Sequence, residues 1–265
     1  MISVLTVNYR CADQLAQLLE SLQTHSAGLD VELVVTNNSP DDPVRLAGGG
    51  DVSVTVFEST NVGFAAGINR AYRASRGNIV MIANPDVRVL DGTLQRAVER
   101  LHADPNIGVV LPLLRYPDGR VQQSARRFYT WPVVLYARSP LRMLRYRPAF
   151  FRRYLCEDLD RSAPVPVDWG LGAAMFLRRS DCDAGHILDE RFFLYFEDVD
   201  LCYGMWQRGR SVMYCPDIEC IHEHRRFSRN PFSQAGWRHL QSLLRFVGKH
   251  GGLRGRPDVH STPQA

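Results

Sequence analysis

Apolar and polar residues alternate in blocks along the first third of the chain, and the blocks predict strands and helices in turn. The short β-prone runs are Ile2–Val7, Val31–Val35, Val52–Phe57 and Ile79–Ala83. Leucines at positions 15, 18, 19 and 22 have helical spacing after the first run, with Asp13 as a candidate N-cap. A helix of small residues is expected between Asn61 and about Ser75. This order predicts an α/β fold with a mostly parallel central sheet flanked by helices.

The pattern is less regular over residues 112–160, where five prolines interrupt it. Within this part, residues 138–155 interleave arginines with apolar side chains. Such a basic amphipathic insertion either lies on an anionic membrane surface or packs as a solvated helix. Residues 211–215 and 218–221 are expected to be strands. Trp237, Leu240, Leu244 and Val247 predict a C-terminal helix over 231–250 with Ser233 as its N-cap, and the tail 251–265 is expected to be disordered.

Composition describes a globular chain that can bury a proper core. The chain has 265 residues, 45% of them hydrophobic, and 32 basic residues against 28 acidic ones give a net charge of +4. This charge is too mild to indicate a nucleic-acid partner. No C-x-x-C spacing is present, and the N-terminus has neither a basic leader nor a long apolar run. These features favour reduced thiols and a cytoplasmic location, with any membrane attachment peripheral.

Carboxylates among aromatic residues are the strongest candidates for chemistry. Glu197, Asp198 and Asp200 follow Phe-Phe-Leu-Tyr-Phe at residues 192–196. Apolar surroundings raise the pKa of a carboxyl group, which makes it a usable proton acceptor near neutral pH. The alternative is a solvated helix N-terminus, where acidic residues meet the helix dipole favourably. Both interpretations apply at once if a helix starts here.

Polar residues follow the predicted strands at the ends where α/β sheets bind ligands. Asn84-Pro85-Asp86 comes directly after the fourth apolar run, so Asp86 either ligates a divalent cation or forms a simple turn. Gly63 and Gly67 permit close backbone approach to a phosphate, or they serve packing.

Five segments, taken in order, resemble family 2 of the glycosyltransferases, and most closely its bacterial rhamnosyltransferase-like and galactofuranosyltransferase-like members. The segments are residues 4–9, 34–39, 61–69, 84–86 and 193–200. The resemblance implies a GT-A fold, inversion at the anomeric carbon, a dTDP or UDP sugar donor, and Mg²⁺ or Mn²⁺. It also implies a catalytic domain at 1–230, with a nucleotide-sugar-binding half at 1–110 and an acceptor half at 111–230.

The same resemblance assigns roles to individual residues. Asp198 would be the general base, with Glu197 orienting it or touching the acceptor. Asp86 would hold the metal, and His222 would complete the metal site or hydrogen-bond the diphosphate, while His224, Arg225 and Arg226 either neutralise phosphate or form a solvated turn. The implied donor-binding residues are Asn8, Asn37, Ser39, Asn61, Gly63, Asn69, Asn84 and Trp169. Two positions depart from the family pattern, because relatives commonly have Asp at positions 36 and 84, where this chain has Thr and Asn.

The function expected from this reading is transfer of rhamnose from dTDP-rhamnose to a hydroxyl of a lipid-linked or polysaccharide acceptor. A UDP-sugar transferase, for example of galactofuranose, is the first alternative. A nucleotide-sugar-binding module without turnover, recruited to a membrane, is an alternative of another class. A nucleotidyltransferase would share the sheet and the metal but would not account for Glu197 and Asp198. The expected location is cytoplasmic, with contact at the inner face of the cell membrane in the membrane-bound alternative.

Overall fold

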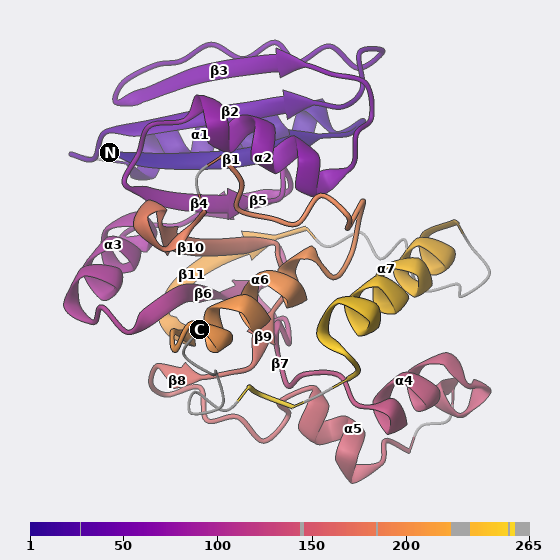
Figure 1. Ribbon diagram of the computed structural model, residues 1–265. Helices are drawn as coiled ribbons and strands as arrows, with labels where there is room; N and C mark the ends of the chain where they lie inside the picture. Colours follow the sequence, from indigo (N-terminus) through magenta and orange to yellow (C-terminus); the bar gives the residue numbers. More distant parts are fainter. Residues whose placement is uncertain (27, 144–145, 184, 224–233, 254, 258–265) are drawn as a thin grey trace, which may run out of the picture.

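The computed structural model describes residues 1–26, 28–143, 146–183, 185–223, 234–253 and 255–257. Figure 1 shows one large sheet with helices on both faces and a smaller group of helices beside it. Several predicted features lie outside the described residues, namely His224, Arg225, Arg226, Ser233 and residues 258–265 of the tail. Within the described part, no helix is long and apolar enough to cross a membrane.

The first half of the sheet consists of four parallel strands in the order β3-β2-β1-β4. Their bounds are β1 Ile2–Asn8, β2 Val31–Asn37, β3 Val52–Glu58 and β4 Ile79–Ala83. Each contains the predicted apolar run and extends it by two residues at most. The polar residues that follow these runs therefore lie at one edge of the sheet.

The second half continues the same sheet from β4 through β10, β6, β11 and β5. β10 is antiparallel to both of its neighbours, whereas β6 and β11 are parallel to each other. The bounds are β5 Val87–Val89, β6 Ile107–Arg115, β8 Val165–Pro166, β10 Ala174–Arg178 and β11 Ser211–His222, with β8 paired to β11. A separate two-stranded sheet joins β7 Ala125–Arg126 to β9 Trp169–Gly170. The boundary predicted after residue 110 falls inside β6, so the two halves share one sheet.

Helices cover both faces of the sheet, and a hydrophobic core lies on each face. Successive side chains of a strand point to opposite faces and so belong to different cores. On one face, α1 Ala12–His25 and α3 Thr93–Ala103 pack with Ile2 and Val4 of β1. On the other, α2 Phe64–Ala74, α6 Glu197–Gln207 and α7 Gln234–His250 pack with Leu5 and Val7. Each leucine or isoleucine buried in this way contributes about 1.5–3 kcal/mol. The helices α6 and α7 are thus anchored on one face of the sheet.

Two local predictions need correction. Asp13 is not the N-cap of α1, because the helix begins at Ala12, whose N–H donates to the carboxylate of Asp42 at 3.2 Å. The two strands expected around residue 216 are one strand, β11, in which a register shift between Cys215 and Glu219 absorbs the proline.

The irregular part contains more helix than predicted. It forms α4 Trp131–Arg138, a 3₁₀ turn at Pro140–Met143 and α5 Ala149–Tyr154. The basic segment 138–155 is therefore divided between these pieces, because prolines at positions 140 and 148 cannot continue a helix from the preceding turn. α4 and α5 lie beside the sheet, at the lower right of Figure 1.

Candidate active site

Asn8 and Asn37, predicted to contact the nucleobase and ribose, lie side by side at the ends of β1 and β2. The amide of Asn8 donates to Oδ1 of Asn37 at 2.9 Å, and the amide of Asn37 donates to Glu58 at 2.9 Å. The N–H of Ser39 also donates to Oδ1 of Asn37, at 3.0 Å. Both asparagines are fully buried. The network ties the ends of β1, β2 and β3 together, and direct contact with a nucleotide stays a prediction.

Gly63 and Asn69 join α2 to the loop that precedes Glu197 and Asp198. Gly63 has φ +92°, and a Cβ at this position would lie 2.6 Å from the carbonyl oxygen of Phe193. Asn61 accepts the N–H of Gly63 at 3.2 Å. The buried amide of Asn69 donates to the carbonyl of Leu188 at 2.7 Å and accepts two main-chain N–H groups. These bonds give Gly63 and Asn69 a structural role, and their predicted contacts with a donor stay predictions.

Asp86 and His222 come together although they are far apart in the sequence. Asn84 and Asp86 follow β4, and the N–H of Asn84 donates to the carbonyl of Ala173 at 2.8 Å. His222 ends β11, which pairs with β5 immediately after Asp86. The two side chains approach to 3.4 Å between Nε2 of His222 and Oδ1 of Asp86.

Gln122 fixes the orientation of the His222 ring. Its Oε1 lies 2.9 Å from Nδ1 of His222, and its amide donates to the carbonyl of His222 at 2.7 Å. With Oε1 as the acceptor, Nδ1 carries a proton and Nε2 of a neutral ring turns its lone pair toward Asp86. A proton on Nε2 would make this contact an ion pair, and a divalent cation between the two groups would be ligated by both.

This donor set fits a divalent cation that also binds substrate oxygens. Mg²⁺ commonly takes one or two carboxylates and completes its shell with water and phosphate, and an imidazole ligand suits Mn²⁺ better. Among the described residues, no group of three or more His, Cys, Asp or Glu side chains stands ready to hold a metal. A metal at Asp86 and His222 would therefore depend on the diphosphate for its remaining ligands.

Glu197 and Asp198, the predicted catalytic carboxylates, lie at the start of α6 after an unusual turn. Tyr195 and Phe196 have φ values of +69° and +71°, a region that bulky residues rarely adopt. The ring of Phe196 is buried and stacks on Tyr129 at 4.9 Å. This packing holds the turn and directs Glu197 and Asp198 toward a cavity.

Asp198 is half-buried and bound by main-chain donors. The N–H groups of Gly172 and Val199 donate to its two oxygens at 2.9 and 2.8 Å. Burial raises the pKa of Asp198, and these N–H groups and the charge of Arg126 oppose part of that rise. The carboxylate is thus oriented and kept available for a proton from a ligand in the cavity.

Glu197 has the opposite character. Burial, and then the charge of Asp198, raise the pKa of Glu197 well above its ordinary value. Its Oε2 is buried without a hydrogen-bond partner among the described residues. The pKa values of both carboxyl groups are therefore raised, that of Glu197 more strongly than that of Asp198.

A cavity of about 700 Å³ gives both carboxylates access to a ligand. Its walls include the rings of Tyr129, Trp169 and His239, together with Gln122. Trp169 is buried, stacks on Tyr129 at 5.6 Å and donates to the carbonyl of Arg127 at 2.8 Å, so it belongs to the wall. Burial, followed by the charge of Arg138, lowers the pKa of His239 to about 4, which leaves this ring neutral.

The cavity connects the two predicted centres. Gln122 lines it and binds His222, which contacts Asp86. From the other side, Asp198 binds Gly172, whose neighbour Ala173 accepts the N–H of Asn84. The structure thus gathers Asn84, Asp86, Glu197, Asp198, Trp169 and His222 around one region, while Asn8, Asn37 and Ser39 lie at the ends of β1 and β2.

Sequence reasoning missed Gln122, Tyr129 and His239. Gln122 lies in the segment without regular pattern, where nothing in the sequence indicates a partner one hundred residues away. His239 had a signal, because the helical spacing of Trp237 and Leu240 predicted its helix. Which cavity that helix would line could not be read from one sequence.

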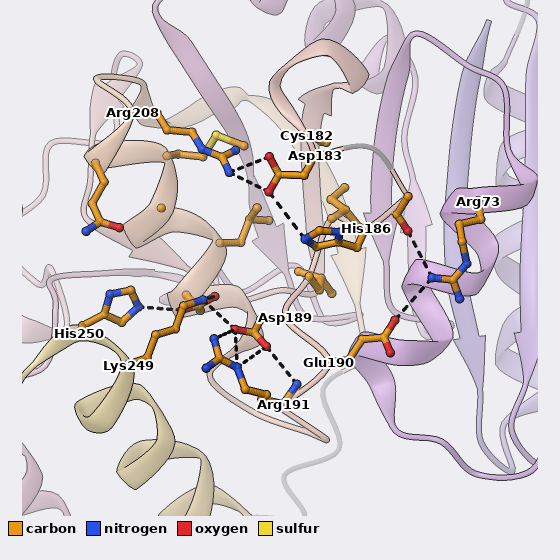
Figure 2. Close-up of a pocket in the computed structure, with 18 residues that line it drawn as sticks. Arg73, Cys182, Asp183, His186, Asp189, Glu190, Arg191, Arg208, Lys249 and His250 are labelled. Carbon is orange, nitrogen blue, oxygen red and sulfur yellow. Dashed lines mark hydrogen bonds and ion pairs between the residues drawn. The ribbon is translucent and has the colours of Figure 1, made fainter. Parts of the chain in front are cut away.

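A second cavity of about 760 Å³ lies between α6, α7 and the loop at residues 182–191. Its charged side chains pair with one another, as Figure 2 shows for Arg73 with Glu190, Arg191 and Lys249 with Asp189, and Arg208 with Asp183. Asp200 joins this network through Lys249 and His250, each at 2.7 Å. These pairs fasten α7 to α6, so Asp200 serves the fold whereas Asp198 faces the first cavity.

Comparison with known proteins identifies the family. The model of Glycosyl transferase family 2 matches residues 3–175. The chain belongs to this family and is a glycosyltransferase. The Mycobacterium tuberculosis N-acetylglucosaminyl-diphospho-decaprenol L-rhamnosyltransferase is 28% identical over 95% of this chain and 86% of its own. Rhamnosyltransferase WbbL of Escherichia coli is 34% identical over 34% of each chain. The resemblance read from the five segments is confirmed.

Solved structures of other glycosyltransferases share the fold. The mannosyltransferase PcManGT of Pyrobaculum calidifontis, solved with GDP-Man and Mn²⁺, is 18% identical with a TM-score of 0.58 over 93% of this glycosyltransferase. GalNAc-T7, solved with UDP, GalNAc and Mn²⁺, is 15% identical with a TM-score of 0.63 over 94%. This chain spans 64% and 48% of those two chains. The predicted GT-A fold is confirmed.

Proposed function

We propose that this glycosyltransferase moves rhamnose from dTDP-rhamnose, with inversion, onto a hydroxyl of a lipid-linked acceptor. The observation that carries the proposal is the half-buried carboxylate of Asp198, held by two main-chain N–H groups at the wall of the 700 Å³ cavity. A single displacement needs one base for the acceptor hydroxyl, on the side opposite the leaving group. In this proposal Glu197, whose pKa is raised more strongly, holds a proton, so Asp198 is the carboxylate that acts as the base.

In this mechanism the acceptor hydroxyl gives its proton to Asp198 as its oxygen attacks the anomeric carbon. Glu197, as a neutral acid, donates a hydrogen bond to a second acceptor oxygen and so fixes which hydroxyl faces Asp198. Asp86 and His222 would hold Mn²⁺ or Mg²⁺, which supplies positive charge for the leaving diphosphate when bound. The aromatic walls at Tyr129 and Trp169 exclude water that would compete with the acceptor.

The donor and acceptor follow from the relative that matches most of the chain. The M. tuberculosis enzyme is named for L-rhamnosyl transfer to N-acetylglucosaminyl-diphospho-decaprenol. We extend to this chain a deoxyhexose donor and an acceptor on a lipid diphosphate. Donor binding would use the polar residues at the ends of β1, β2 and β4, with Asn61 and Gly63 nearby. Three findings would displace this proposal: that the donor is a UDP sugar, that the acceptor is a polysaccharide, or that the protein binds nucleotide sugars without turnover.

Contact with the inner face of the cell membrane forms part of the proposal. Large apolar side chains are exposed on α4 and the turn after it, among them Trp131 at 51%, Leu135 at 67% and Tyr146 at 75%. Arginines alternate with them over residues 138–153, as on surfaces that lie on anionic bilayers. Trp237 on α7 adds a further exposed aromatic ring. A lipid-linked acceptor would meet the protein at this surface.

The test is a transfer assay with dTDP-rhamnose, UDP-galactofuranose and other UDP and dTDP sugars. A synthetic prenyl-diphosphate N-acetylglucosamine and its phosphate-free glycoside serve as paired acceptors. We expect product with dTDP-rhamnose and the diphosphate acceptor, in the presence of Mn²⁺ or Mg²⁺, and with inverted anomeric configuration by NMR. Product from a UDP sugar alone would replace the donor. Metal-dependent binding of nucleotide sugars without any product would favour the binding module.

A further inference from the structure

The cavity that holds Asp198 is lined by more arginines than carboxylates. Besides Glu197 and Asp198, the described residues of its lining include three arginines and no other acidic or basic side chain except His239, whose ring is neutral. The arginines are Arg126, Arg142 and Arg147.

Arg126 is the most enclosed of the three. Its guanidinium donates to the carbonyl of Ala125 at 2.7 Å and to the hydroxyl of Tyr154, and its charge reaches Asp198. In the described part of the chain, no ion pair joins Arg126 to a carboxylate. Its charge therefore stands next to the base without a direct salt bridge.

Arg142 and Arg147 come from the exposed turn between α4 and α5. Among the residues that the structure describes, the guanidinium of Arg142 donates to a main-chain carbonyl, that of Ala137 at 3.4 Å, and has no carboxylate partner. Arg147 pairs with Glu157 at 2.5 Å, but the same carboxylate also pairs with Arg152 at 3.1 Å. One carboxylate thus serves two guanidinium groups, and positive charge remains at this part of the cavity.

Apolar groups continue from these arginines to the surface. The cavity wall beside them contains Phe151 and Leu155. The same turn and helix expose Leu141 at 55% and Phe150 at 42%. A ligand that reaches from Asp198 to this surface meets carboxylates first, then guanidinium groups, and then an apolar face.

We infer that Arg126, Arg142 and Arg147 form an anion subsite for the phosphate groups that link the acceptor sugar to its lipid. Resting on the proposed function, this inference adds which residues recognise the acceptor. Guanidinium groups bind phosphate oxygens by paired, charge-assisted hydrogen bonds. The sugar hydroxyl then lies at Asp198 and the prenyl chain leaves along the apolar surface of α4 and α5. The subsite selects a sugar joined to phosphate over a neutral glycoside.

Binding can be tested without turnover. The probe is geranyl diphosphate, titrated by calorimetry into the full chain with EDTA present, so that metal-dependent diphosphate binding at Asp86 and His222 does not contribute. The double variant Arg142→Gln/Arg147→Gln should weaken binding at least tenfold, which corresponds to about 1.4 kcal/mol. Arg153→Gln is the matched control, because Arg153 is exposed on α5 but does not line the cavity. It should change the affinity by less than about twofold.

Further arms separate this subsite from other phosphate sites. Asp86→Ala should bind geranyl diphosphate as the wild type does, whereas loss of binding would place the probe at the donor site and overturn the inference. Geraniol should bind at least tenfold more weakly than its diphosphate. Equal affinities of the wild type and the double variant for geranyl diphosphate would also overturn it. Binding of the wild type and the double variant to anionic vesicles is compared as well. A double variant that loses binding to these vesicles but keeps its affinity for geranyl diphosphate would also overturn the inference, because the arginines would then recognise membrane charge.

Kinetics tie the subsite to the reaction. In neutral detergent, the double variant should raise KM for the prenyl-diphosphate acceptor at least tenfold and leave KM for the nucleotide sugar unchanged. With the phosphate-free glycoside, wild type and variant should be equal, and an equal loss on both acceptors would contradict the subsite. Should no sugar be transferred although geranyl diphosphate binds as predicted, the proposed function fails and the subsite stands.

Discussion

Replacing Asp198 by Asn tests the general base with little change in shape. The carboxylate accepts the N–H of Gly172 at one oxygen and that of Val199 at the other. An amide keeps one acceptor but turns its NH₂ group toward the other N–H. Removing one partner of a buried hydrogen bond costs about 1–3 kcal/mol, so the variant should fold with a lowered Tm.

The loss of activity should be much larger than the loss of stability. A positioned general base contributes roughly 10²- to 10⁴-fold in rate, which is about 2.7–5.5 kcal/mol of the activation barrier. We expect Asp198→Asn to lower kcat by this factor while the Kd for the nucleotide sugar stays the same. The assay measures initial rates at saturating donor and acceptor, with Tm recorded for the same samples. Since Asp198 must be ionised to accept a proton and burial raises its pKa, wild-type kcat should fall as the pH drops through a value above that of an ordinary aspartate.

Asp200→Asn is the matched control, because it makes the same change two residues further along α6. Asp200 pairs with Lys249 and His250 on the side of the second cavity. This variant should lose stability but keep kcat within about threefold, since buried ion pairs serve the fold and not the reacting atoms. An Asp198→Asn enzyme that retains more than about a tenth of wild-type kcat would refute Asp198 as the base.

Four other substitutions make sharp predictions. Asp86→Ala should abolish the effect of Mn²⁺ or Mg²⁺ on nucleotide-sugar binding, and an undiminished effect in calorimetry would move the metal elsewhere. His222→Ala should lower kcat by about tenfold to a hundredfold at saturating Mn²⁺ and donor, which a normal rate would contradict. Glu197→Gln should raise Tm at pH 7 but not at pH 4. The pKa of Glu197 is higher in the native state than in the unfolded chain, so the native state binds the carboxyl proton more tightly. The unfolding free energy of the wild type therefore falls as pH rises above about 4.3, the ordinary pKa of glutamate, and glutamine avoids this loss. A lower Tm of that variant at pH 7 would count against a protonated Glu197. Gly63→Ala should cost about 1–3 kcal/mol of unfolding free energy, because its φ is +92° and its Cβ would meet Phe193; unchanged denaturant midpoints would refute this.

Strands of the first half were predictable because their apolar runs are short, continuous and bounded by polar residues. β4 begins and ends where the pattern places it, at Ile79 and Ala83. β11 was predicted in two pieces, because Pro216 interrupts the apolar run and only pairing with β6 shows that a register shift absorbs it. Asp13 has the residue type of an N-cap, yet Asp42 supplies the acceptor from a distant loop.

The site was only partly predictable for a related reason. Local sequence shows that Glu197 and Asp198 lie among aromatic residues, which indicates burial and altered pKa values. It cannot show that Oε2 of Glu197 has no hydrogen-bond partner in the described part of the chain while Asp198 has two main-chain donors, because Gly172 is distant in the chain. The pairing of Asp86 with His222 followed from the family resemblance, whereas Gln122, which orients the imidazole, carried no signal of its own.

The most direct test of the whole account is mass spectrometry of a prenyl-diphosphate N-acetylglucosamine acceptor after incubation with dTDP-rhamnose and Mn²⁺. The account predicts that wild-type enzyme adds one deoxyhexose residue to the acceptor, and that Asp198→Asn enzyme, folded and binding donor, adds almost none. Addition of the sugar at equal rates by both enzymes, or no addition by wild type with any nucleotide sugar that it binds, would contradict it.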